Sequence, residues 1–180
     1  PFNSNFIYNT YVLESAEKEG VLVVNKPSSL RDCNEKVFAT EFPECCTPFL
    51  VASDPNLLKS FIEDHKDTVI KPLDGMGGSS IFRLRNSDPN LNVILETITE
   101  SFSTKVMIQT YIPEITDGDK RILLINGVPM NAAVARIPAR GELRGNLAAG
   151  ASAVARSLTE KDIWICEQVG PKLKELGLVL

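Results

Sequence analysis

The feature of this sequence that most constrains its fold is a glycine-rich segment, Asp74-Gly75-Met76-Gly77-Gly78-Ser79-Ser80, between two strand-like runs. Residues 68–73 are mostly apolar, and residues 81–85 alternate apolar and basic side chains. The segment is therefore predicted to be the tip of a β-hairpin. Three glycines in four positions let a backbone approach an anion closely. The tip indicates a phosphate-binding turn, and a hairpin that merely needs glycine is the alternative.

Two familiar nucleotide-binding motifs do not fit this segment. A P-loop needs Gly-Lys-Ser/Thr at the end of the spacing G-x-x-x-x-G, but Ser80 stands five positions after Gly75 and no lysine follows it. A dinucleotide-binding fingerprint leads into a helix, whereas residues 81–84 are predicted to be a strand. Phosphate binding at a turn between two strands is a different architecture.

The rest of the chain alternates between helical and strand patterns, which predicts an α/β fold with at least two layers. Residues 138–158 are small and polar without a sustained period, so we expect a mobile lid loop there. Helices are predicted at 6–19, 29–40, 55–64, 91–101 and from Thr159 to Gly177, and strands at 21–25, 49–52, 68–73, 81–85, 106–111, 120–125 and 132–137.

Composition excludes several functional classes. Of 180 residues, 43% are apolar and 23% charged, which predicts an ordinary globular protein, and a net charge of -4 gives no reason to bind nucleic acid. No apolar run approaches the roughly 20 residues of a membrane helix. Four cysteines without a CxxC pair indicate free thiols and a cytoplasmic location, and one histidine argues against a Ser/His/Asp hydrolase. Both ends of the chain are expected to continue in a longer protein.

Charged side chains near the predicted strands are candidate site residues. Lys71 lies in an otherwise apolar strand, where an unpaired ammonium is unfavourable, so a ligand phosphate would suit it; an internal acid or an exposed edge position is the alternative. Arg121, Arg136 and Arg144 fall at a strand start, at the end of the next strand and in the lid. Guanidinium groups bind carboxylates and phosphates bidentately, although each could instead be a surface arginine.

Several longer motifs resemble one family, the bacterial glutathione synthetases of the ATP-grasp superfamily. They cover nearly the whole chain in the family's order: VLVVNKP at 21–27, LRDCNEK at 30–36, IKPLDGMGGSSIF at 70–82, DGDKRILLINGVP at 117–129, ARIPARGELRGNLAAG at 135–150 and EQVGPKL at 167–173. The chain departs from the family at Gly150-Ala151-Ser152-Ala153, where a Gly-Gly-Arg-Gly run is common, so the flexibility of the lid is left open.

The resemblance implies a partial ATP-grasp fold: the end of a central lobe at 1–52, a small lobe at 53–115, and the start of a large lobe at 116–180 that carries the lid. It further implies ATP held between two lobes, with Mg²⁺ bridging its phosphates and metal ligands expected beyond Leu180, so that no metal ligand lies in the chain. The chain itself is then expected to be incomplete as a catalyst. Residues implied to contact ATP are Lys36, Lys71, Asp74, Gly75, Met76, Gly77, Gly78, Ser79, Gln109, Tyr111 and Ile112.

The implied reaction joins γ-glutamylcysteine and glycine through an acyl phosphate to give glutathione, in a homotetrameric enzyme. Arg121 and Arg144, with Asn146, would hold the dipeptide's carboxylates, and Arg136 would stabilise the transferring phosphoryl group; these three arginines are the catalytic candidates. Two alternatives remain at this point: another ATP-grasp ligase, acting on D-alanine or adding glutamate, or a nucleotide-binding module without catalysis.

Overall fold

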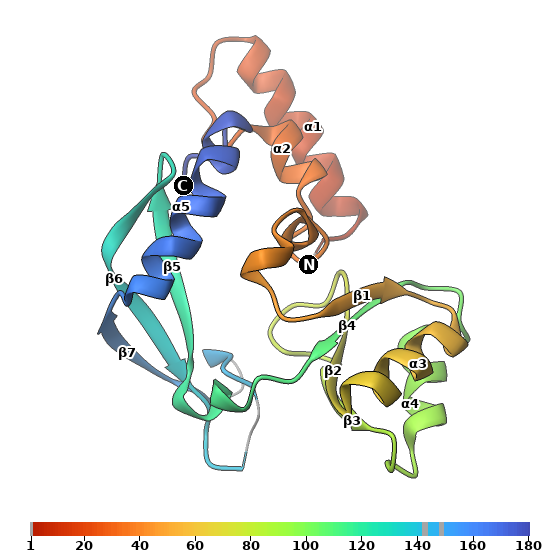
Figure 1. Ribbon diagram of the computed structural model, residues 1–180. Coiled ribbons are helices and arrows are strands. Elements are labelled where there is room, and N and C mark those ends of the chain that lie inside the picture. The colour runs from red at the N-terminus through yellow and green to blue at the C-terminus, as the bar shows by residue number, and fades with distance from the viewer. Residues whose placement is uncertain (1, 142–143, 148–149) are drawn as a thin grey trace. The chain divides into compact units, whose positions relative to one another are not determined.

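The computed structural model describes residues 2–141, 144–147 and 150–180. The chain forms two compact units: one is continuous, Glu35–Pro113, and the other combines the residues up to Asn34 with Glu114–Leu180 (Figure 1). The sequence placed lobe boundaries after residues 52 and 115. The structure divides the chain at 34/35 and 113/114 instead, and each unit is described separately below.

The continuous unit is an antiparallel sheet with two helices. The sheet has the order β1-β4-β2-β3, and β2 and β3 form the hairpin that the sequence predicts. The side chain of Asp54 accepts hydrogen bonds from the N–H groups of Asn56 and Leu57 and so begins the first helix. The elements are β1 (Phe49–Ala52), α3 (Pro55–His65), β2 (Asp67–Pro72), β3 (Phe82–Arg85), α4 (Leu91–Ile98) and β4 (Val106–Thr110), with short 3₁₀ helices η1 (Phe38–Glu41) and η2 (Pro43–Cys45) before them.

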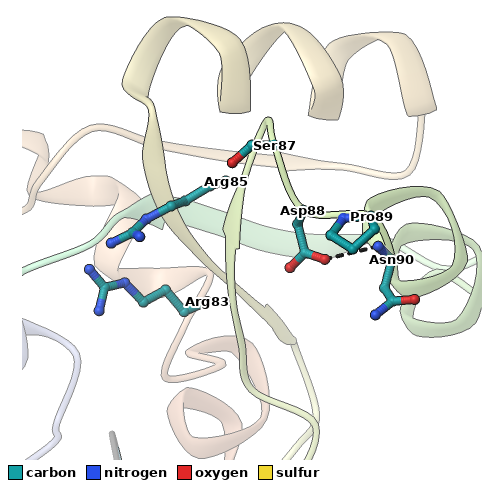
Figure 2. Close-up of a pocket in the computed structure, with 6 residues that line it drawn as sticks. All are labelled: Arg83, Arg85, Ser87, Asp88, Pro89 and Asn90. Carbon is teal, nitrogen blue, oxygen red and sulfur yellow. Dashed lines mark hydrogen bonds between the residues drawn. The ribbon is translucent and has the colours of Figure 1, made fainter.

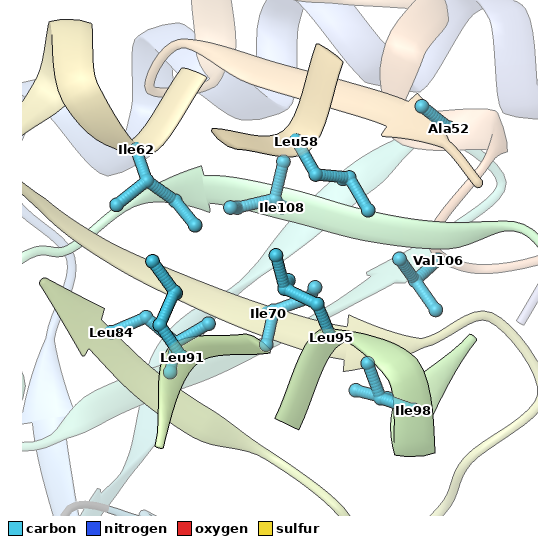
Figure 3. Packing of buried hydrophobic residues seen from close by; sticks show 10 residues of the cluster. All are labelled: Ala52, Leu58, Ile62, Ile70, Leu84, Leu91, Leu95, Ile98, Val106 and Ile108. Carbon is cyan, nitrogen blue, oxygen red and sulfur yellow. The ribbon is translucent and has the colours of Figure 1, made fainter. Parts of the chain in front are cut away.

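Both helices pack on one face of this sheet (Figure 3). Because side chains alternate along a strand, the residues between the core positions point to the opposite face. Lys71 and Gln109 are among these, while Ile70 and Ile108 are fully buried in the core. The core comprises Ala52, Leu58, Ile62, Ile70, Leu84, Leu91, Leu95, Ile98, Val106 and Ile108.

The other unit contains a second antiparallel sheet, β5-β6-β7. The turn Asn126-Gly127 joins β5 to β6, with positive φ at both residues. Helix α5 packs on the face that buries Ala133 and Ala135, and Thr159 and Asp162 form the capping box at its start. The elements are α1 (Ser4–Lys18), α2 (Pro27–Asp32), η3 (Pro113–Asp117), β5 (Asp119–Ile125), β6 (Val128–Ile137), β7 (Ser152–Ser157) and α5 (Glu160–Glu175).

Two predicted elements are wrong, one of them in part. Residues 21–25 form no strand, because β-branched composition does not supply a partner strand; instead the Asn25 side chain hydrogen-bonds the backbone of Val179 and Leu180. The helix predicted at 29–40 ends at Asp32, and Lys36 lies in a turn. Asp and Asn side chains at 32 and 34 compete for backbone hydrogen bonds, which favours such an end.

The lid prediction is wrong in its last part. Residues 152–157 form β7, which pairs with β6 from Ala132 to Ile137. Every residue of β7 is exposed. The alternation of apolar and polar side chains that identifies a half-buried strand in a sequence is not expected for a strand whose two faces are both exposed. Residues 142–143 and 148–149 of the predicted lid lie outside the described residues.

Candidate functional site

The glycine turn connects β2 to β3, and its backbone conformation requires glycine. Gly77 and Gly78 have φ of +70° and +82°, values that other residues adopt only with strain. At Gly75 a larger residue is disfavoured by lack of space, because a Cβ there would lie 2.6 Å from Cγ of Pro72. Lys36 supports the turn, since its Nζ donates to the carbonyl oxygens of Gly75 at 2.8 Å and Leu73 at 3.3 Å. Asp74, Met76 and Ser79 are exposed.

Lys71 lies immediately before this turn, on the sheet face opposite the helices. Its Nζ donates to Oε1 of Gln109 at 2.6 Å. Burial lowers the pKa of Lys71, and the nearby Lys36 ammonium lowers it further, while Glu35 and Cys46 act in the opposite direction. Two ammonium groups thus approach each other beside a turn built of glycines. A multiply charged anion at this place would relieve their repulsion.

Tyr111 and Ile112 follow β4 and connect the continuous unit to the rest of the chain. The N–H of Tyr111 donates to the carbonyl oxygen of Asp67 at 3.0 Å. The guanidinium of Arg83 lies over the Tyr111 ring, with Cζ 3.7 Å from the ring centroid. Tyr111 is half-buried and Ile112 is 44% exposed, so apolar surface is available at this segment.

Asp67 and Arg83 are site-forming residues that the sequence reasoning did not single out. Asp67 binds Arg83 through Nε and Nη2 at 2.7 and 2.6 Å and also binds Arg85. The hydrogen bonds from Arg83 are the main reason that the pKa of Asp67 falls to about 2, and those from Arg85 assist. The basic side chains that alternate with apolar ones at 81–85 were the only feature of the sequence that pointed to Arg83. They did not indicate that Asp67 would be its partner.

A pocket of about 450 Å³ lies at the far end of the same hairpin, between β3 and α4. Figure 2 shows Arg83 and Arg85 extending from β3 in the same direction, and Asp88 accepting a hydrogen bond from the backbone N–H of Asn90. Ser87 and Pro89 complete the lining. None of the residues that the sequence assigned to a site lines this pocket.

The second sheet brings together the predicted arginines. Asp119 and Arg136 face each other across β5 and β6, and Arg136 donates through Nε and Nη2 to the two carboxylate oxygens at 2.7 and 2.6 Å. This pairing raises the pKa of Arg136. Arg121 lies two residues from Asp119 on β5 and therefore on the same face, away from α5.

The segment that contains Arg144 and Asn146 passes directly beside this ion pair. A Cβ added at Gly145 would lie 3.0 Å from both the Asp119 carboxylate and the Arg136 carbonyl oxygen. The structure therefore gathers Arg121, Arg136 and the 144–146 segment at one sheet face. Asp119 was not a sequence candidate, although it stands in the motif that supplied Arg121.

In the part of the chain that the structure describes, no three His, Cys, Asp or Glu side chains are grouped so that they could hold a metal ion. None of the described helices is both long and apolar enough to cross a membrane.

Comparison with solved structures identifies the class of fold. The chain is similar to the ATP-grasp ligase PsnB complexed with a minimal precursor, Mg and ADP, with a TM-score of 0.64 and 18% identity over 94% of this chain and 50% of that one. It is also similar to the D-alanine–D-alanine ligase of Bacillus anthracis, with a TM-score of 0.58 and 16% identity over 91% of this chain and 55% of that one. The chain therefore has the ATP-grasp fold.

Comparison of sequences identifies the family within that class. Residues 35–180 match the model for the prokaryotic glutathione synthetase ATP-grasp domain, and residues 1–31 match the model for the N-terminal domain of the same enzymes. The chain belongs to the prokaryotic glutathione synthetase family.

Individual relatives are consistent with this assignment. Glutathione synthetases of Pseudomonas putida and Escherichia coli are 60% and 54% identical to the chain over 99% of its length. The chain covers 56% and 57% of these proteins, so it spans little more than half the length of the curated relatives it matches.

Proposed function

We propose that the protein containing this chain is an ATP-dependent ligase that joins γ-glutamylcysteine and glycine to form glutathione. The observation that carries the proposal is the placement of two lysines at the glycine turn: Lys36 Nζ binds the carbonyl oxygens of Leu73 and Gly75, and Lys71 lies on the strand that leads into the turn, where burial and Lys36 disfavour its charge. Glu35 binds Lys36 at 3.0 Å and acts on Lys71 as well, but it offsets only part of this effect, because the pKa of Lys71 remains lowered. The phosphates of a nucleotide would offset that repulsion, and the glycines would let backbone N–H groups approach them.

The arginine face of the second sheet supplies the complementary chemistry. Arg121 and Arg144, with Asn146 beside Arg144, would bind the carboxylates of the dipeptide. Arg136 would stabilise negative charge on the transferring phosphoryl group, because Asp119 fixes the orientation of its guanidinium. These roles require positioning and electrostatic stabilisation rather than a protein nucleophile.

In the proposed reaction, a carboxylate oxygen of γ-glutamylcysteine attacks the γ-phosphorus of ATP, and ADP leaves. The amine of glycine then attacks the acyl carbon, and inorganic phosphate leaves with the electron pair of the broken carbon–oxygen bond. Mg²⁺ would neutralise phosphate charge in such a reaction. The described residues hold no group suited to a metal ion, so no step is assigned to it within this chain.

Location and assembly are further parts of the proposal. The free thiols of Cys33, Cys45, Cys46 and Cys166 support a reducing compartment, and we place the protein in the cytoplasm. A homotetramer is the expected assembly, and sedimentation equilibrium of the purified protein would give its mass directly.

A coupled assay for ADP release tests the proposed reaction. ATP hydrolysis should depend on γ-glutamylcysteine, and ligated product should form only when glycine is also present. Activity with pairs of D-alanine, or with glutamate as the added amine, would replace this substrate assignment with another ATP-grasp ligation. Nucleotide binding without turnover of any of these substrates by the complete protein would support a binding module instead.

A further inference from the structure

Asp67 anchors the segment after β4 by two separate contacts. Its carbonyl oxygen accepts the Tyr111 N–H at 3.0 Å, which fixes the main chain. Its carboxylate holds the guanidinium of Arg83 through two nitrogens, which fixes the plane of that group over the Tyr111 ring. The Asp67–Arg83 pair is about 70% buried on each side chain, with exposures of 30% and 28%, so solvent screens it less than a typical surface pair.

The stacked pair shares a sheet face with Lys71. Asp67 and Lys71 lie four residues apart on β2, so both side chains are on the same face and about 13 Å apart along the strand. Gln109, which accepts from Lys71, lies on β4 two residues before Tyr111. One face of the sheet thus carries an ammonium toward one end and a cation stacked on an aromatic ring toward the other.

We propose that Arg83 is a positioning residue for the nucleotide: held by Asp67, it stacks on Tyr111 and fixes the segment 111–112 that receives the base. This inference rests on the proposed function, because it assumes that a nucleotide binds with its phosphates at Lys71 and its base at the exposed apolar surface of residues 111–112. Arg83 acts on the base through Tyr111 and makes no contribution to the transfer of the phosphoryl group.

The neighbouring Arg85 provides a matched control within the same strand. It binds the same Asp67 oxygen as Arg83, at 2.8 Å from Nη2, but Arg83 is the one that lies over Tyr111. Arg85 is also more exposed, at 57% of its side chain. Removing Arg85 therefore changes the charge around Asp67 without removing the contact with Tyr111.

Calorimetric titration of the complete protein with ADP tests the inference. Arg83→Met should raise the Kd for ADP by up to about 30-fold, the limit reached if the whole free energy of a partly desolvated cation–π contact serves to order the segment 111–112 before the base binds. Arg83→Lys should give a smaller rise, because lysine keeps the charge but loses the planar group. Tyr111→Leu should match Arg83→Met, and the double variant should be no worse than either single variant. Arg85→Met should bind ADP like the unaltered protein.

Steady-state kinetics separate positioning from a general structural defect. The KM for ATP should rise in Arg83→Met, while kcat at saturating ATP and the KM for γ-glutamylcysteine stay unchanged. An unchanged Kd in Arg83→Met, or an equal loss in Arg85→Met, would overturn the inference. If Arg83→Met fails to fold, Arg83→Lys and Tyr111→Leu still decide it. Absence of ADP binding by the unaltered protein would instead overturn the proposed function.

Discussion

The ammonium of Lys71 lies where burial and the neighbouring Lys36 both disfavour its charge. Its lowered pKa means that the charged side chain destabilises the folded state below that pKa, so its removal should relieve this cost. Lys71→Met should leave the thermal midpoint of the ligand-free protein unchanged or raised. It should also raise the Kd for ATP by about 10- to 150-fold, as for loss of a hydrogen bond from a charged group.

Differential scanning fluorimetry and calorimetric titration would measure these two effects on one preparation. Lys59→Met, an exposed change on α3, is the matched control and should alter neither quantity. A large fall in the midpoint with unaltered ATP affinity would mean that Lys71 serves the fold rather than a ligand.

Asp67 makes the stability of the continuous unit depend on pH in a defined direction. Its pKa is about 2 in the folded protein and about 3.9 in an unfolded chain. Because the folded value is depressed, its contribution is complete above about pH 4 and is lost as the pH falls toward 2. Asp67→Asn should lower the free energy of unfolding by about 1 kcal/mol at pH 6.

Urea unfolding at pH 6, 4 and 3 would follow this dependence. The difference between Asp67→Asn and the unaltered protein should shrink at the lowest pH, whereas Glu63→Gln, an exposed change on α3, should show no such trend. A difference that is constant from pH 6 to 3 would contradict the assigned cause.

At the scale of elements, α5 meets the β5–β6 turn by backbone contact. A methyl group added at Gly170 would overlap the carbonyl oxygen of Gly127, and one added at Gly127 would lie 2.7 Å from the carbonyl oxygen of Gly170. Glycine to alanine inside a helix ordinarily stabilises it by about 0.5–1 kcal/mol. Here overlap should reverse the sign, and Gly170→Ala should destabilise the protein by about 1–3 kcal/mol.

Chemical denaturation would measure this change, with Glu167→Ala as the control at an exposed position of the same helix. The control should be close to neutral. A stabilised Gly170→Ala would show that α5 can shift away from the turn without loss of packing.

Local signals in the sequence predicted many of the elements but not their pairings. The helices predicted at 55–64 and from Thr159 and the β2–β3 hairpin are confirmed, because the residues that begin each helix or turn are neighbours in the chain. The partner of Arg136 could not be predicted in this way. Asp119 faces it only because the register is set by the turn at 126–127 and by an irregularity between Ile122 and Leu124.

The same limit explains the partial success at the candidate site. Lys71 was identified from the sequence because a charged side chain in an otherwise apolar strand contradicts the burial that the strand pattern predicts. Its contact with Gln109 and the stacking of Arg83 on Tyr111 join segments that are far apart in the sequence. No local sequence pattern predicts such contacts. The strand β7 was missed for the opposite reason: its pairing with β6 is regular, but every one of its residues is exposed.

At the scale of the whole molecule, the charged groups of the candidate site fall into two sets on two different compact units. Lys36, Lys71 and the glycine turn belong to Glu35–Pro113, whereas the three arginines belong to the other unit. If one set binds the nucleotide and the other the dipeptide, single substitutions should separate the two affinities. Arg144→Ala should raise the KM for γ-glutamylcysteine about tenfold or more and leave the Kd for ATP within about twofold.

Lys71→Ala should give the converse result, a weakened Kd for ATP with little change in the KM for the dipeptide once ATP is saturating. Arg140→Ala, an exposed arginine four residues before Arg144, controls for loss of positive charge in the same segment and should change neither constant. Equal losses for both ligands in Arg144→Ala would refute the division of roles. Arg144 would then contribute to nucleotide binding as well as to dipeptide binding.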